Sequence, residues 1–197
     1  MPSQIVLASN NTGKLKEFQQ LLADRHFDVV PQAQFKVSDV EETGLSFVEN
    51  ALIKARHASK IAGLPAIADD SGLEVDFLDG APGIYSARFS SADANDGKNN
   101  QKLLELLNAV PDAQRSARFQ CVLVYMRHPL DPTPLICQGT WEGRILKQPQ
   151  GNNGFGYDPL FLDPTTGLSS AELSKEEKNT RSHRAKALQC LLAQLSQ

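Results

Sequence analysis

The order in which strand-like and helix-like segments alternate constrains the fold of this chain more than any other sequence feature. The apolar run Ile5–Ala8 has the length of a buried strand, and a polar loop separates it from apolar residues spaced for a helix that begins near Lys14. A second helix is expected up to about Ala62, because Ser46 and Glu49 have the spacing of a capping box. Strands and helices interleave in this way throughout, which predicts an α/β fold.

Shorter segments between these elements also have strand or turn character. We expect extended pieces at Phe27–Val30 and Phe35–Val37 and a short buried strand at Ala66–Ala68. That strand is expected to end in a turn at Asp69–Gly72, from which Leu73–Val75 leaves as another strand.

The second half of the chain contains the strongest strand candidates. They are Phe119–Met126 and Leu135–Trp141, which a proline-rich turn separates and which we expect to pair as neighbours. Leucines with helical spacing around Leu103 predict a helix that precedes these two strands. A final helix is expected to begin near Ser174, which has capping-box spacing to Glu177. A hairpin among interleaved helices predicts a mixed rather than a wholly parallel sheet.

Length and composition favour one globular domain over residues 1–197, with two lobes. The formal net charge of -3 provides no field that would attract nucleic acid or an anionic membrane, so neither is expected as a partner. The N-terminus lacks the basic and apolar regions of a signal peptide, and the three cysteines form no C-x-x-C pair. A cytoplasmic protein with reduced thiols is therefore expected.

The polar loop after the first strand has the features of an anion-binding site. It leads into a helix N-terminus, where free amide groups and the helix dipole favour phosphate, and Lys14 adds a full positive charge. It is not a Walker A loop, because Ala8 and Leu15 stand where that motif needs Gly and Ser or Thr. The alternative is a helix cap beside a solvated lysine. The candidate phosphate-binding residues are Ser9, Asn10, Asn11, Thr12, Gly13 and Lys14.

Two acidic pairs are candidates for a metal site. Asp69 and Asp70 place two carboxylates together, which suits Mg²⁺ or the activation of a water molecule, and Glu41 and Glu42 lie in a loop before a helix. Carboxylates gathered around one site would repel each other unless a metal neutralised them. The alternatives are a simple turn for the first pair and a solvated loop for the second.

A glycine-rich loop at Gly151–Pro159 is a candidate site for a nucleotide base. Phe155 can stack on a base, and the carboxylate of Asp158 can accept its ring hydrogens. The alternative is a plain turn in which Phe155 and Tyr157 are buried.

The polar half of the final helix is a further candidate for binding substrate. Lys178, His183 and Arg184 can each donate hydrogen bonds to phosphate or to a purine carbonyl. The alternative is a solvated helix face.

Taken in order, these segments form a pattern that runs the length of the chain. Its parts are Ser9-x-Asn11-x-x-Lys14, Glu42-Thr43-Gly44, Phe47-x-Glu49-Asn50-Ala51, Ala68-Asp69-Asp70-Ser71-Gly72-Leu73, Pro82-Gly83-Ile84-Tyr85-Ser86-Ala87-Arg88, Gly154-Phe155-Gly156-Tyr157-Asp158-Pro159 and Ser182-His183-Arg184. The pattern resembles the inosine triphosphate pyrophosphatase family, whose members remove dITP, ITP and XTP from nucleotide pools.

The resemblance implies a long curved mixed sheet with flanking helices, two lobes enclosing a nucleotide cleft, and a homodimer. It implies Mg²⁺-dependent hydrolysis of non-standard purine nucleoside triphosphates to the monophosphate and pyrophosphate. Asp70 is implied as the general base and Glu42, Asp70 and Asp69 as the metal site. The implied substrate contacts are Ser9, Asn10, Asn11, Thr12, Gly13, Lys14, Ser71, Phe155, Gly156, Tyr157, Asp158, Lys178, His183 and Arg184.

Chemistry gives a reason for the base preference. A 6-oxo purine offers acceptors to His183 and Arg184, whereas the amino group of adenine would leave these donors unpaired. Two other functions are considered: a Maf-like pyrophosphatase acting on modified pyrimidine triphosphates, and a nucleotide-binding sensor without turnover. The Phe155–Asp158 and Ser182–Arg184 segments speak against the first, and the paired carboxylates against the second.

Overall fold

The computed structural model describes residues 3–22 and 27–195. The strands are β1 Ser3–Leu7, β2 Phe27–Pro31, β3 Ala66–Val75, β4 Ser116–Met126, β5 Leu135–Ile145, β6 Phe161–Asp163 and β7 Leu168–Ser169. The helices are α1 Thr12–Leu22, α2 Phe47–Ala62, α3 Asp96–Leu106, α4 Lys175–Arg181 and α5 His183–Leu195. Short 3-10 helices cover Gln32–Phe35, Asp76–Leu78, Gly83–Arg88, Asp112–Gln114 and Asp158–Leu160.

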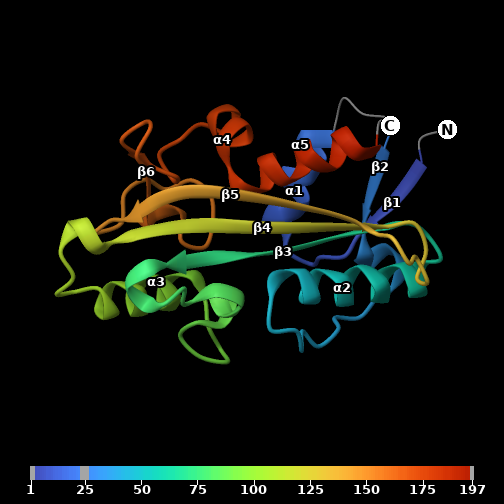
Figure 1. Cartoon of the computed structure of the whole chain (residues 1–197), viewed down its shortest axis with the longest axis horizontal. Helices are drawn as coiled ribbons and strands as arrows, with labels where there is room; N and C mark the ends of the chain where they lie inside the picture. Colours follow the sequence, from blue (N-terminus) through green and yellow to red (C-terminus); the bar gives the residue numbers. More distant parts are fainter. Residues whose placement is uncertain (1–2, 23–26, 196–197) are drawn as a thin grey trace. The chain divides into compact units, whose positions relative to one another are not determined.

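The strands form one mixed sheet in the order β2-β1-β3-β4-β5-β6-β7. β1 runs parallel to both β2 and β3, whereas β6 pairs antiparallel with β5 and β7. β4 and β5 are neighbours, as expected for the two strongest strand candidates. The predicted α/β class with a mixed sheet and flanking helices is therefore confirmed (Figure 1).

The chain divides into two compact units. The first contains residues 1–70, 121–139 and 184–197, and the second contains residues 71–120 and 140–183. The strands β3, β4 and β5 each have residues in both units.

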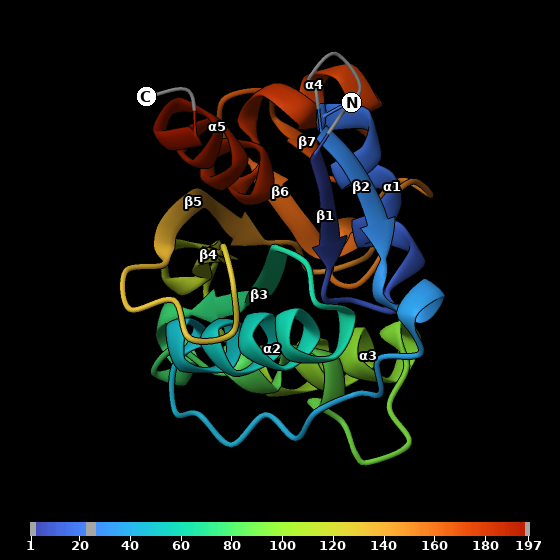
Figure 2. The same cartoon turned by 90° about the vertical axis from the view of Figure 1, so that its right-hand side faces the viewer.

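In the first unit, helices cover both faces of the strands (Figures 1 and 2). On one face, Phe18 of α1 and Leu188 of α5 pack with Ile67 of β3 in one apolar cluster. On the other face, Ala55 of α2 packs with Ala68 of β3 in a second cluster. Neighbouring residues of β3 therefore point to opposite faces, because side chains alternate along a strand.

The second unit has its own apolar core. Leu103 of α3 packs there with Phe119, Trp141 and Phe161 from three strands. The rings of Phe119 and Phe161 have centroids 4.4 Å apart. Each unit thus packs its strands and helices around apolar side chains of its own.

Three local expectations from the sequence are wrong. The turn predicted at Asp69–Gly72 is part of the continuous strand β3. Phe35–Val37 is not extended, since Phe35 ends a 3-10 helix and Lys36 has a left-handed backbone with φ of 54°. The single final helix is two helices, because Ser182 is extended with ψ of 155° between α4 and α5.

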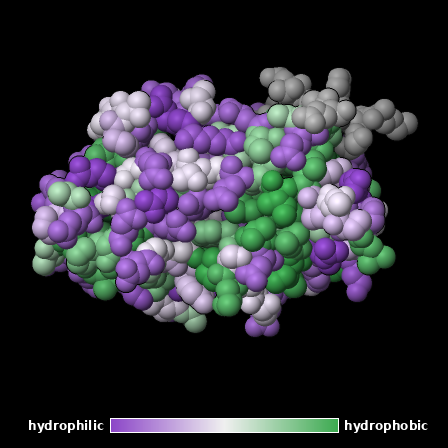
Figure 3. Space-filling view, viewed as in Figure 1, coloured by the Kyte–Doolittle hydropathy of each residue, from purple (hydrophilic) through white to green (hydrophobic). Residues whose placement is uncertain are grey.

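The visible surface mixes hydrophilic and hydrophobic side chains, with green hydrophobic patches set among purple hydrophilic ones (Figure 3). Over residues 3–22 and 27–195, no helix combines the length and the apolar character needed to cross a membrane.

Candidate active site

The loop after β1 is fixed by its own polar side chains. The Asn11 side chain caps α1 by accepting a hydrogen bond from the Lys14 backbone N–H at 3.0 Å, and the Ser9 hydroxyl accepts one from Asn11 N–H at 3.1 Å. Asn10 donates from Nδ2 to the Asp39 carboxylate at 2.7 Å. Since α1 begins at Thr12, the first turn contains Thr12, Gly13 and Lys14, and its amide groups form a helix N-terminus suited to an anion.

The two aspartates of β3 lie on opposite faces of the strand and have different partners. Asp69 faces α1 and α5, where it pairs with Lys14 and Arg184. Asp70 faces α2, where it pairs with Lys54. The two carboxylates are therefore not side by side, because β3 continues through both residues.

Asp69 is the centre of a buried charge cluster. Its Oδ2 accepts hydrogen bonds from Arg184 Nε and from the Cys121 thiol, each at 3.0 Å, and Lys14 pairs with Oδ1. Burial alone would raise the pKa of Asp69, but the positive charges of Arg184 and Lys14 outweigh it and hold the pKa well below its ordinary value. Asp69 is therefore ionised and orients both cations. Arg184 is in turn paired with Glu17.

On the α2 face, an ammonium group lies between two carboxylates. Lys54 Nζ is 2.7 Å from Asp70 Oδ1 and 3.1 Å from Glu42 Oε1, and it donates to the Asp69 carbonyl at 2.8 Å. The other oxygen of Asp70, Oδ2, is buried and has no hydrogen-bond partner among the described residues. Burial and the negative charge of Glu42 raise the pKa of Asp70, although Lys54 opposes them.

The loop that carries Glu42 is tied to the start of α2. Gly44 N–H donates to the Asn50 side chain at 2.8 Å, and Asn50 is fully buried. A Cβ on Gly44 would lie 2.5 Å from the Cβ of Glu49, so only glycine fits there. These contacts place Glu42 opposite Lys54.

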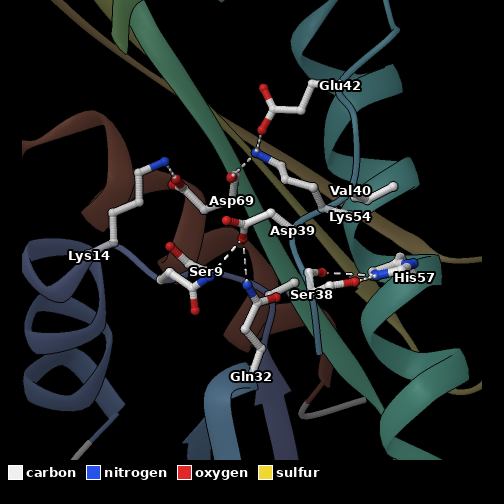
Figure 4. Close-up of a pocket in the computed structure, with 12 residues that line it drawn as sticks. Ser9, Lys14, Gln32, Ser38, Asp39, Val40, Glu42, Lys54, His57 and Asp69 are labelled. Atoms are coloured by element: carbon white, nitrogen blue, oxygen red, sulfur yellow. Dashed lines mark hydrogen bonds and ion pairs between the residues drawn. The ribbon is translucent and has the colours of Figure 1, made fainter. Parts of the chain in front are cut away.

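One pocket of about 170 Å³ in the first unit has a lining that includes Ser9, Asn10, Lys14, Glu42, Lys54 and Asp69 (Figure 4). The close-up shows Lys14 and Lys54 on either side of Asp69, with Glu42 beyond Lys54 and Ser9 below. The pocket thus has cationic groups from α1 and α2, a capped helix N-terminus, and carboxylates that can bind a metal ion.

In the second unit, Asp158 organises the glycine-rich loop. Its Oδ2 accepts hydrogen bonds from Phe155 N–H at 2.9 Å and from Lys178 Nζ at 2.6 Å, while Oδ1 accepts one from the Ser170 hydroxyl at 2.8 Å. The Lys178 ammonium lies 5.4 Å from the centre of the half-buried Phe155 ring, a cation–π contact. A Cβ on Gly154 would lie 2.0 Å from Asp158 Oδ2, so this close approach requires glycine.

The remaining predicted contacts of the second unit are placed by packing. Tyr157 is buried and donates from its hydroxyl to the Ser86 carbonyl at 2.8 Å, and burial raises its pKa. His183 is also buried and stacks on Phe119 with ring centroids 4.8 Å apart and an interplanar angle of 17°. Tyr157 thus holds the loop rather than presenting its hydroxyl to solvent.

The structure gathers the residues expected from the sequence into two groups. In the first unit Ser9, Asn10, Asn11, Thr12, Gly13, Lys14, Glu42, Asp69, Asp70 and Arg184 lie around the two faces of β3. In the second unit Phe155, Gly156, Tyr157, Asp158 and Lys178 form the loop network, with Ser71 in β3 and His183 at the start of α5. Among the described residues, no three of the His, Cys, Asp and Glu side chains form a group that could hold a metal alone.

Lys54 is a site residue that sequence reasoning missed. It lies in the middle of an amphipathic helix, where lysines are usually solvated, and its partner Asp70 is 16 residues away. A partial signal exists, because α2 begins five residues after Glu42 and its residues must pack beside β3.

The chain is similar to known proteins over nearly its full length. The model of the Ham1 family matches residues 5–194. A dITP/XTP pyrophosphatase from Photobacterium profundum is 63% identical over 193 residues, which are 98% of each chain. One from Escherichia coli O157:H7 is 60% identical over 189 residues, which are 96% of each chain.

Solved structures of Ham1 proteins are also similar to this chain. A Ham1 protein from Coxiella burnetii is 52% identical, with a TM-score of 0.91 over 98% of each chain. The Ham1 protein of Staphylococcus aureus is 41% identical, with a TM-score of 0.87 over 98% of each chain. The resemblance inferred from the motifs is confirmed over nearly the full length, and the chain belongs to the Ham1 family.

Proposed function

We propose that this protein hydrolyses non-standard purine nucleoside triphosphates such as dITP, ITP and XTP to the monophosphate and pyrophosphate. Relatives that share about 60% of its residues over nearly their full length are dITP/XTP pyrophosphatases. The observation that carries the proposal is the buried Asp70 carboxylate, whose Oδ2 has no partner among the described residues and which lies in contact with Lys54.

The donor set beside Asp70 fits a divalent cation. An ammonium group already lies between Glu42 and Asp70 at 3.1 and 2.7 Å, so these carboxylates are arranged to accept positive charge, and their oxygens suit Mg²⁺. We therefore assign Glu42 and Asp70 as the residues that hold Mg²⁺. When bound, the ion neutralises charge on the phosphate oxygens. Asp69 has both oxygens engaged by Lys14, Arg184 and Cys121, so we assign it to orienting these cations.

The residues of the first unit can carry out an in-line hydrolysis. The free oxygen of Asp70 accepts the proton of the attacking water molecule, which is the role of a general base. The N-terminus of α1 and the Lys14 ammonium bind the triphosphate and stabilise the pyrophosphate that leaves. Lys54, in contact with Asp70, keeps that carboxylate oriented.

Recognition of the base is assigned to the second unit. Phe155 stacks on the purine, Asp158 and Lys178 form hydrogen bonds with it, and His183 donates to a 6-oxo group. Adenine would place its amino group opposite these hydrogen-bond donors and leave them unpaired. Binding of adenine nucleotides is therefore disfavoured.

Purified protein with Mg²⁺ tests the proposal. We expect pyrophosphate release from dITP and XTP to be much faster than from dATP or dGTP. Asp70→Asn should lower kcat roughly 10²- to 10⁴-fold, as expected for loss of a general base, while nucleotide binding stays measurable. Asp93→Asn, which changes an exposed carboxylate paired with Lys98, is the matched control and should keep wild-type activity.

Equal rates on all four triphosphates would contradict the substrate assignment. Full activity in Asp70→Asn would remove this residue from the catalytic role.

The resemblance also leads us to propose a homodimer in the cytoplasm that does not bind nucleic acid. Size-exclusion chromatography with light scattering tests the dimer, and a mass of 21.5 kDa would contradict it.

A further inference from the structure

The backbone on both sides of Phe155 consists of glycines in a left-handed conformation. Gly154 has φ of 79° and Gly156 has φ of 62°. Glycine loses more conformational freedom on folding than any other residue, so its own preferences do not hold such a loop in one shape. The loop needs contacts from elsewhere if Phe155 is to keep one position.

Two side chains of α3 provide these contacts at a single residue. Asp96 Oδ2 accepts a hydrogen bond from Gly156 N–H at 2.7 Å, and Asn100 Nδ2 donates one to the Gly156 carbonyl at 2.8 Å. Asp96 and Asn100 are four residues apart in a helix and therefore share one face. Together they fix the peptide groups on both sides of Gly156, directly after Phe155.

Stability does not explain why an asparagine stands at position 100. Its Oδ1 is buried and has no hydrogen-bond partner among the described residues. A buried acceptor without a partner opposes folding, so an apolar side chain of similar volume would be tolerated better unless the Nδ2 contact were needed. A buried unsatisfied group of this kind points to a functional constraint.

We propose that Asp96 and Asn100 are positioning residues for the purine base. They fix Gly156 so that the Phe155 ring is held ready to stack, and they act through the loop rather than by touching the substrate. This inference rests on the proposed function, in which Phe155 binds the base. A preorganised loop binds its ligand more tightly because less freedom is lost on binding.

The test uses the full chain with Mg²⁺ and measures KM and kcat for dITP. The variants are Asp96→Ala, which removes the acceptor, and Asn100→Leu, which removes the donor but keeps the volume. We expect each to raise KM about tenfold and to leave kcat within about twofold, because the general base is untouched. Asp96→Asn keeps an acceptor oxygen and should restore most of the wild-type KM.

Two further measurements separate positioning from general damage. Inorganic triphosphate has no base, so its inhibition constant should be the same in wild type and variants. The melting temperature of Asn100→Leu should stay near that of wild type. The matched control is Gln101→Ala, which changes an exposed neighbour on α3 whose side chain donates to Glu105, and it should leave KM unchanged.

An unchanged KM in Asp96→Ala and Asn100→Leu would overturn the proposal. So would an equal rise of KM and of the inhibition constant for inorganic triphosphate, since that would indicate damage beyond the base loop. A wild-type protein that fails to hydrolyse dITP would instead contradict the proposed function, which this assay detects before any variant is compared.

Discussion

Replacing Asp69 by asparagine removes the negative charge that two cations of the first unit share. Lys14 pairs with Oδ1 and Arg184 with Oδ2, and the side chains of Asp69 and Arg184 are 0% and 3% exposed. Breaking a buried ion pair by neutralising one partner typically costs about 3 to 5 kcal/mol, because the other charge stays buried. Glu17 keeps a partial compensation for Arg184, so we expect a loss of about 3 kcal/mol.

This loss is large enough to measure by thermal unfolding. In a chain of this size, 1 kcal/mol shifts Tm by about 2 to 4 °C, so Asp69→Asn should melt roughly 6 to 12 °C below wild type. Asp112→Asn changes an exposed carboxylate that pairs with the exposed Lys147 at 3.0 Å, and it should melt like wild type.

The pH dependence makes the test specific for the charge. The pKa of Asp69 is lower in the folded chain than in the unfolded chain, where it is about 3.9. The carboxylate therefore stabilises the fold fully above about pH 5 and loses this contribution as the pH falls through the lower folded pKa. The Tm difference between wild type and Asp69→Asn should shrink below about pH 4. A difference that is small at pH 7, or constant down to pH 3, would refute this account of the cluster.

Three further changes address the second unit. Phe155→Ala should raise the KM for dITP roughly tenfold with little change in kcat, since base stacking contributes about 1 to 3 kcal/mol; steady-state kinetics that show a lower kcat alone would argue against stacking. Gly154→Ala places a Cβ 2.0 Å from Asp158 Oδ2 at a φ of 79°, so differential scanning fluorimetry should show a lower Tm, and a wild-type Tm would mean that the loop relaxes freely. Tyr157→Phe removes the 2.8 Å hydrogen bond to the Ser86 carbonyl and should lower the urea unfolding free energy by about 1 kcal/mol; no loss would show that this bond contributes nothing net.

Elements with strong periodicity were predictable from sequence. The helix expected up to Ala62 ends there, and Ser46 caps it as the spacing indicated. The two strands expected in the second half also form, although β4 begins three residues before Phe119 and β5 ends four residues after Trp141. Such elements are specified by local patterns that packing reinforces, so a single sequence is enough to find them.

The segment Asp69–Gly72 shows why local chemistry misleads at a site. Asp, Ser and Gly favour turns when they are solvated, yet here the aspartates are buried and paired with cations from three helices. These partners come from positions 14, 54 and 184, and no local pattern connects them to β3. Tertiary contacts therefore override the turn propensity. For the same reason, neither the contacts of Lys54 nor the hydrogen bonds from Asp96 and Asn100 to Gly156 could be predicted without the fold.

The alternation of Asp69 and Asp70 across β3 limits how this segment can change in evolution. A deletion or insertion of one residue between Ala66, which pairs with β1, and Asp69 would turn every following side chain to the other face. The carboxylate that now faces α2 would then meet Lys14 and Arg184, and its neighbour would meet Lys54. A change of two residues would keep each side chain on its face but would move both carboxylates about 7 Å along the strand, away from their cations. The spacing from Ala66 to Asp70 is therefore as much a part of the site as the two aspartates themselves.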